Sequence, residues 1–225
     1  FNFFITDFFN YRTKQIAIAN QLEINNYIIK IMAFTAKLLS KCIFICVHVP
    51  SKNCDYTIPS LINLKKIERK KVNKKLFLAY SVSGHDFYKR LNLIAKKNSS
   101  FQFKYFTNTK IEEKLSKNIT IYKPEKLKFY KYLEICGAVL CTSGDTLPCE
   151  CTYNNIPSAI MPCSKKHFEQ VHNIKKYVKK LKYCDYFSDS LDLKHLANKN
   201  MKKINLHLLN SLKDRDKKIL NLVNF

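Results

Sequence analysis

Small and polar residues that could bind a phosphate group follow an apolar segment in the middle of the chain. Residues 137–141 read Gly-Ala-Val-Leu-Cys and predict a buried strand, and the polar residues that follow predict a turn that opens a helix. Gly144 would permit a positive φ in this turn. Asp145 or Thr146 can act as the N-cap, and Pro148 suits the first helical turn. Because backbone N–H groups at a helix start attract anions, above all phosphates, this turn is a candidate phosphate site.

Further polar side chains occupy positions that could serve the same ligand. Glu150 lies about one turn deeper in the helix, within reach of a ribose. A second strand is expected at residues 158–161, and the polar residues Glu169, Gln170 and Asn173 follow at the start of another helix. Each feature also has an ordinary explanation: a capped helix, a solvated acid and a polar first helical turn.

The order of these features resembles the nucleotide-sugar half of GT-B glycosyltransferases. The resemblance is strongest to a family 28-like group of bacterial and archaeal proteins, relatives of the peptidoglycan N-acetylglucosaminyltransferase. That group carries Gly-x-Ser/Thr-x-x-x-Glu, two spaced prolines and then Phe-Glu-Gln-x-x-Asn. The positions of this chain that fall on the pattern are Gly144, Thr146, Glu150, Pro157, Pro162, Phe168, Glu169, Gln170 and Asn173.

The resemblance assigns an expected role to each part of this pattern. Glu150 would accept hydrogen bonds from the ribose hydroxyls. The nucleotide diphosphate would be held by hydroxyl and backbone N–H donors of Ser143, Gly144 and Thr146. The donor sugar would be bound by Glu169, Gln170 and Asn173, because sugars require both acceptors and paired donors. A second phosphate-facing loop could come from Ser83 and Gly84.

The implied reaction is transfer of a hexosyl or other glycosyl group from a nucleotide-diphospho-sugar, with uridine diphosphate as the expected carrier and no metal or other cofactor. The catalytic base would come from the first domain, where relatives place polar residues at Ala19 and Leu22, so the catalytic residue is unknown. The chain begins with Phe1 inside a strand-like run, which suggests a fragment or a degenerate member that is inactive alone. Two alternatives stay open: a non-catalytic nucleotide-binding remnant, and a basic protein that binds nucleic acid or an anionic membrane surface.

The composition is that of a globular and strongly basic protein. The chain has 225 residues, 46% of them hydrophobic, and a formal net charge of +23, so it can bury a core despite its charge. The basic run at residues 63–75 is expected to be an exposed linker, with contact to an anionic membrane surface as the alternative. Nucleic acid is not an expected partner, because this run has one arginine and no aromatic residue to stack on bases.

Cysteines and long apolar runs bear on the cellular compartment. Most of the nine cysteines stand in apolar contexts, such as Cys42, Cys46, Cys136 and Cys141, which predicts small core side chains rather than disulfides or zinc ligands. The sequence shows neither a signal peptide nor an apolar run that could span a bilayer. A cytoplasmic protein, in contact at most with the membrane surface, is therefore expected.

The elements that must position these residues alternate along the second half of the chain. Strands are expected at residues 76–80, 101–106, 119–122, 137–141, 158–161 and 184–187, with helices between most of them. This alternation predicts an α/β fold with a Rossmann-like parallel sheet, as in a GT-B C-terminal domain. The loops after Tyr80, Cys141 and Pro162 would then meet at the carboxyl edge of the sheet.

The expected domain organisation has four parts. Residues 1–62 would form a partial N-terminal α/β domain on the acceptor side, with strands at 2–6, 16–19 and 42–49 and a helix at 24–41. The basic linker covers residues 63–75. Residues 76–190 would form the nucleotide-sugar-binding domain, and residues 191–225 would form C-terminal helices.

Overall fold

The chain forms two compact units in a computed structural model that describes residues 15–20, 42–47, 56–58, 66–69, 71–81, 85–144, 146–164 and 168–223. The smaller unit comprises residues 1–61 and 209–225. It contains three parallel strands in the order β1 (Gln15–Asn20), β2 (Cys42–Val47) and β3 (Tyr56–Ile58). The first two confirm predicted strands, and β3 was not predicted. The strand expected at residues 2–6 and the helix expected at 24–41 lie outside the described residues.

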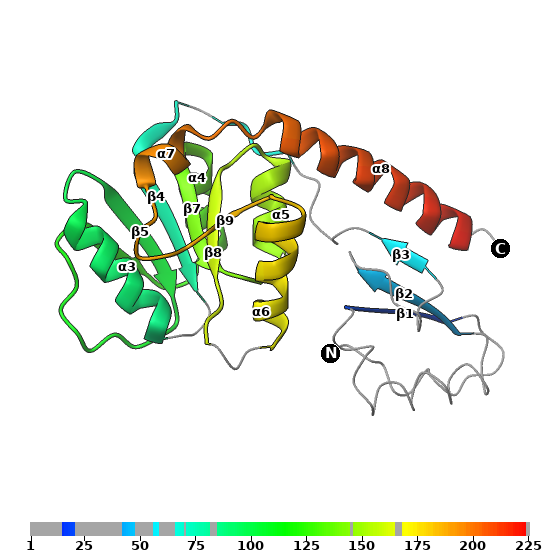
Figure 1. Ribbon diagram of the computed structural model, residues 1–225, viewed down its shortest axis with the longest axis horizontal. Helices are drawn as coiled ribbons and strands as arrows, with labels where there is room; N and C mark the ends of the chain where they lie inside the picture. Colours follow the sequence, from blue (N-terminus) through cyan, green and yellow to red (C-terminus); the bar gives the residue numbers. More distant parts are fainter. Residues whose placement is uncertain are drawn as a thin grey trace. The chain divides into compact units, whose positions relative to one another are not determined.

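The larger unit, residues 62–208, is built on a six-stranded sheet in which every pairing is parallel (Figure 1). Its order is β6-β5-β4-β7-β8-β9. The strands are β4 (Asn73–Ser81), β5 (Gln102–Thr107), β6 (Ile119–Tyr122), β7 (Cys136–Thr142), β8 (Ser158–Met161) and β9 (Asp185–Tyr186). All residues of β7 and β8 are buried, as expected for central parallel strands that are covered on both faces. The predicted Rossmann-like sheet is confirmed.

Helices connect the strands and cover both faces of this sheet. They are α3 (His85–Lys97), α4 (Lys126–Ile135), α5 (Thr146–Tyr153), α6 (Phe168–Ile174), which continues as the π-helix η1 (Lys175–Lys180), and α7 (Leu193–Asn198). A last helix, α8 (Lys202–Val223), begins in the larger unit, and its residues from 209 on belong to the smaller unit. Helices α3 and α7 lie on one face, and α4, α5 and α6 lie on the other (Figure 1). None of the described helices has the length and apolar character needed to cross a membrane.

The side-chain alternation of the strands divides the core between the two faces. On the α3 face, Phe77 and Ala79 of β4 pack with Phe103 and Tyr105 of β5 and with the buried face of α3. On the α4 face, the ring of Phe129 lies 5.6 Å from that of Tyr80 and 5.4 Å from that of Phe106. Both faces are therefore filled, and the carboxyl edge of the sheet is left for loops.

The strand order sets the place of a ligand site. The chain builds β4, β5 and β6 outward on one side, then returns to place β7 directly beside β4. Ligands of such sheets bind at this topological switch point, beyond the carboxyl ends of the strands. Because β4, β7 and β8 are parallel neighbours, the segments after Ser81, Thr142 and Met161 leave the same edge.

The basic segment before β4 departs in part from the expected exposed linker. Its last three residues, 73–75, begin β4, and residues 71–75 are exposed. The backbone N–H of Ile67 donates to Asn154 Oδ1 at 2.8 Å, and Arg69 Nη2 donates to the Cys136 carbonyl at 2.7 Å. Ile67 and Arg69 are partly buried, because they bond to the turn after α5 and to the start of β7.

Candidate functional site

A pocket of ≈ 640 Å³ opens at the topological switch point, on the side of the sheet that α4, α5 and α6 cover. This volume falls in the range of small-molecule and cofactor sites. The pocket combines an aromatic wall, a helix start and several polar side chains. Its lining residues are Tyr80, Pro124, Glu125, Lys126, Phe129, Tyr130, Thr142, Gly144, Thr146, Leu147, Glu150 and Gln170.

The apolar wall of the pocket comes from β4 and α4. Tyr80 and Phe129 meet edge to face, and Phe129 also packs edge to face with Tyr130, at a centroid distance of 6.2 Å. Burial raises the pKa of Tyr130, and the nearby carboxylate of Glu150 raises it further. Tyr130 is therefore a neutral hydrogen-bonding group at neutral pH, and the wall offers flat aromatic surface to a ring-shaped ligand.

The polar side of the pocket is the start of α5. The helix begins at Thr146, so the N–H groups of Thr146 and Leu147 precede its first intrahelical hydrogen bonds. Pro148 follows as the third helical residue, where the missing N–H costs the helix nothing. Glu150 stands one turn further along and also lines the pocket. The residues of α5 that are predicted to bind the phosphate and the ribose thus line one cavity.

Ser143 holds the turn after β7 in place rather than facing the pocket. Its side chain is fully buried, and its N–H donates to the Met161 carbonyl at 2.8 Å. Its hydroxyl donates to the Gln170 carbonyl at 2.8 Å, and its own carbonyl accepts a hydrogen bond from Asn173 Nδ2 at 2.9 Å. Both donors of Ser143 are used within the protein, so direct contact with a phosphate would require them to exchange partners.

Gln170 and Asn173 complete this arrangement. Gln170 lines the pocket, and its Oε1 accepts a hydrogen bond from the N–H of Cys163 at 2.7 Å. Asn173 is buried, and its amide nitrogen bonds to the carbonyl of Ser143. These contacts join the turns after β7 and β8 to α6. Gln170 and Asn173 of the Gln-x-x-Asn pattern therefore stabilise these two turns.

The positive φ that Gly144 permits is not adopted in the structure. Among the described residues other than glycine, positive φ values occur at Asn155 and Lys182, and the φ of Gly144 lies outside the left-handed region. The N–H of Gly144 bonds to the Thr142 carbonyl at 2.8 Å, which closes a tight turn without that conformation. A Cβ placed on Gly144 would meet nothing within 4 Å. The glycine therefore leaves open space at the pocket.

Some predicted site residues cannot be placed. Ser83, Gly84 and Asp145 lie outside the described residues, and Glu169 is described only as a backbone position in α6. Of the predicted ligand-binding residues that are described, Gly144, Thr146, Glu150 and Gln170 line the pocket together, whereas Ser143 and Asn173 support it from behind.

The cysteines near the sheet are buried thiols. Burial raises the pKa of Cys136 and of Cys184 to about 12, and it also raises the pKa values of Cys141 and Cys151. These thiols are therefore protonated at neutral pH. In the described part of the chain, His, Cys, Asp and Glu side chains form no group of three that could hold a metal ion.

Sequence reasoning missed the aromatic wall and the segment Pro124–Lys126 of the pocket. Pro124 lies two residues after the end of β6, so its place at the carboxyl edge of the sheet could have been inferred from the expected parallel strand at residues 119–122. Tyr80 and Phe129 carry no local signal, because aromatic residues at strand ends and on helix faces are usually core residues. Their exposure to the pocket depends on how α4 lies on the sheet.

Comparison with known proteins gives the family and the fold. The family model described as glycosyl transferase family 1 matches residues 6–204. No curated protein matches the sequence.

Solved structures of GT-B glycosyltransferases share the fold. The spinosyn forosaminyltransferase SpnP matches with a TM-score of 0.55 and 10% identity, and the match covers 91% of this chain and 64% of the SpnP chain. The glycosyltransferase SnogD from Streptomyces nogalater matches with a TM-score of 0.51 and 10% identity, over 87% and 61%. MurG from Acinetobacter baumannii matches with a TM-score of 0.50 and 12% identity, over 86% and 62%. The chain thus spans less than two thirds of the length of these structures, and the expected GT-B resemblance is confirmed.

Proposed function

Because the chain belongs to glycosyl transferase family 1, we propose that its larger unit binds a nucleotide-diphospho-sugar, the donor of a glycosyl transfer reaction. The observation that carries this proposal is the pocket at the switch point. It brings Gln170 to one cavity with Gly144, Thr146 and Glu150, which lie twenty residues or more earlier in the chain, beside an aromatic wall. The pocket therefore offers aromatic rings for the base, a carboxylate for the ribose, a helix start for the diphosphate and an amide for the sugar.

The proposed ligand fits the pocket in a fixed order. The base lies against Tyr80, Phe129 and Tyr130, because every base has a flat face that stacks on aromatic rings. Glu150 accepts hydrogen bonds from the ribose hydroxyls, and the diphosphate lies at the start of α5. The open space beside Gly144 lets a phosphate approach the N–H groups of Thr146 and Leu147 more closely than a side chain there would allow.

The donor sugar lies toward Gln170, whose side chain is already oriented by the Cys163 N–H. In the transfer step, the bond between the anomeric carbon and the phosphate oxygen breaks and an acceptor hydroxyl forms the new bond to that carbon. The negative charge that develops on the leaving diphosphate is stabilised by the start of α5, which is preorganised for an anion. The acceptor proton must go to a base outside the residues assigned here.

Calorimetry with uridine diphosphate tests this proposal, with thymidine diphosphate as the alternative carrier. We expect binding between the micromolar and millimolar ranges. Glu150→Gln removes a charged acceptor for the ribose and should weaken binding about tenfold or more. Thr146→Ala should weaken it less, because the backbone N–H remains. The matched control is Thr120→Ala, at an exposed threonine on the edge strand β6, away from the pocket. Equal affinity in Glu150→Gln and Thr120→Ala would contradict the proposal.

Contact with an anionic membrane surface, expected from the basic segment at residues 63–75, stays a prediction. The described part of this segment supports it with the exposed residues Lys66, Lys71, Lys74 and Lys75. Co-sedimentation with phosphatidylserine vesicles should then occur at low salt and be lost at high salt. Binding that is equal on vesicles of phosphatidylcholine alone would rule out this electrostatic origin.

A further inference from the structure

A second pocket, of ≈ 460 Å³, opens on the opposite face of the sheet, where α3 lies against the ends of β8 and β9. It shares no lining residue with the pocket at the switch point. Met161 and Pro162, at the end of β8, contribute to its lining. These residues play no part in the proposed nucleotide site, so the second pocket is considered as a separate site.

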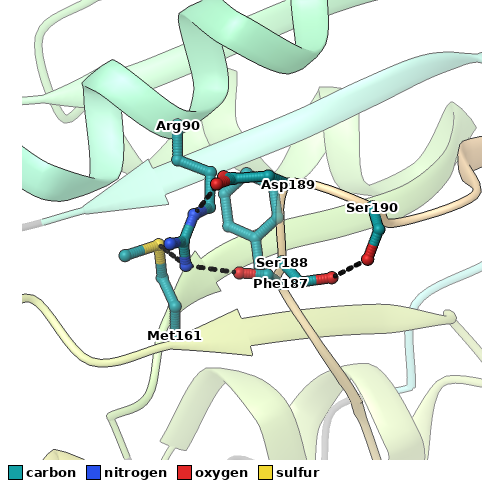
Figure 2. A network of polar contacts seen from close by, with 6 residues as sticks. All are labelled: Arg90, Met161, Phe187, Ser188, Asp189 and Ser190. Carbon is teal, nitrogen blue, oxygen red and sulfur yellow. Dashed lines mark hydrogen bonds and ion pairs between the residues drawn. The ribbon is translucent and has the colours of Figure 1, made fainter.

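Arg90 fixes the shape of this second pocket. Figure 2 shows its side chain reaching from α3 to the ends of β8 and β9. Its Nε lies 2.7 Å from Asp189 Oδ1, and its Nη1 donates to the Phe187 carbonyl at 2.9 Å and contacts Met161 Sδ at 3.7 Å. Through its Nε and Nη1, Arg90 joins α3 to the ends of β8 and β9, and its charge is already paired with that of Asp189.

Two large apolar side chains are exposed in the same pocket. Leu93 on α3 is 40% exposed and Tyr186 on β9 is 43% exposed. A single exposed apolar side chain on a surface is ordinary. Two that line one cavity provide apolar surface that a ligand could cover, and the Tyr186 ring is the flat part of it.

The charges of the pocket balance. Asp86 and Asp189 contribute two carboxylates, and Lys89 and Arg90 contribute two cations. Arg90 pairs with Asp189, and Lys89 lies at the exposed rim, 3.9 Å from Glu113. A charged ligand therefore gains little net attraction here. A neutral ligand with many hydroxyl groups gains more, because carboxylates accept from hydroxyls and ammonium groups donate to them.

From these features we propose that the second pocket binds a neutral saccharide. The C–H face of a sugar ring lies on Tyr186 and Leu93, and its hydroxyl edge bonds to Asp86 and Lys89. A monosaccharide or disaccharide fits a cavity of this size. This site is separate from the proposed donor site, so it stands whether or not the first pocket binds a nucleotide.

Saturation-transfer NMR on the full chain tests the proposal. The probes are methyl β-glucopyranoside, methyl β-galactopyranoside and cellobiose, each measured without and with excess uridine diphosphate to occupy the first pocket. Glucuronic acid and glucosamine serve as charged counterparts. The variants are Tyr186→Ala, Tyr186→Phe and Leu93→Ser. The control variant is Ile121→Ala, because Ile121 is 45% exposed on the edge strand β6, away from both pockets.

The proposal predicts saturation transfer to at least one neutral probe, a titrated affinity about tenfold weaker in Tyr186→Ala, and near-normal affinity in Tyr186→Phe and Ile121→Ala. Leu93→Ser, at an exposed helix position, should also weaken binding and serves as an independent variant. Three results would overturn the proposal: no transfer to any neutral probe, transfer that excess uridine diphosphate removes, or equal binding by Tyr186→Ala and Ile121→Ala. A clear preference for glucuronic acid or glucosamine would also overturn it.

Discussion

Substitution of the two described glycines of the β7 segment should separate folding from ligand binding. A Cβ on Gly144 would meet nothing within 4 Å, and the backbone there is outside the left-handed region. A Cβ on Gly137, seven residues earlier, would lie 2.8 Å from Lys74 Cα and 3.0 Å from the Lys74 carbonyl oxygen. The same change of one methyl group therefore meets open space at one position and the backbone of β4 at the other.

The expected stabilities follow from this contrast. Gly144→Ala should leave the fold intact and stabilise it by about 0.4–1 kcal/mol, because alanine restricts the unfolded chain. Gly137→Ala should destabilise it by about 1–3 kcal/mol, because the Lys74 backbone can yield only if β4 shifts. Urea denaturation followed by circular dichroism measures both. The midpoint should rise or stay unchanged for Gly144→Ala and fall clearly for Gly137→Ala.

Binding should show the opposite order. Gly144→Val fills the space through which a phosphate approaches α5, and the loss of one charge-assisted hydrogen bond weakens binding by about 1.5–3 kcal/mol, or tenfold to hundredfold. Calorimetry with uridine diphosphate measures this loss, and Gly137→Ala should retain the parent affinity wherever it is folded. Parent affinity in a folded Gly144→Val protein would refute the phosphate site at this turn.

Three further outcomes are expected. Asn173→Ala should lower the free energy of unfolding by about 1–3 kcal/mol in urea titration, because it leaves the buried Ser143 carbonyl without its donor, whereas the exposed Asn108→Ala should change it little. The free energy of unfolding should fall as the pH rises from about 9 toward 12, because burial raises the pKa of Cys184 from 9.0 to about 12 and so favours the protonated thiol in the folded state. Cys184→Ala should reduce this dependence of the free energy of unfolding on pH. An unchanged dependence would contradict the raised pKa of Cys184. Iodoacetamide should label Cys163 first among the cysteines with described burial, as read by mass spectrometry, and early labelling of the buried thiols would contradict the packing at Cys136, Cys141, Cys149, Cys151 and Cys184.

Much of the larger unit could be predicted from the sequence, because its strands are short apolar runs bounded by clear turns. The strands at residues 119–122 and 158–161 were placed at their observed bounds. The parallel sheet followed from strands that alternate with helices. The order of the strands was not predicted, because adjacency of β4 and β7 depends on contacts between residues about sixty positions apart.

The pocket was predicted in part, for a similar reason. Thr146 and Glu150 lie on one helix, so their spacing alone places them on neighbouring turns. The separation of Gln170, which lines the pocket, from Asn173, which lies behind it, depends on the packing of α6 against the Ser143 turn. The conformation of Gly144 could not be predicted, because glycine in a turn permits a positive φ without requiring it.

A crystal structure of the chain with uridine diphosphate would test the proposed donor site most directly. The diphosphate should lie at the start of α5 beside Thr146, with the ribose within hydrogen-bond distance of Glu150 and the base against Tyr80 and Phe129. A nucleotide bound elsewhere, or a pocket that stays empty at saturating nucleotide, would contradict this donor site.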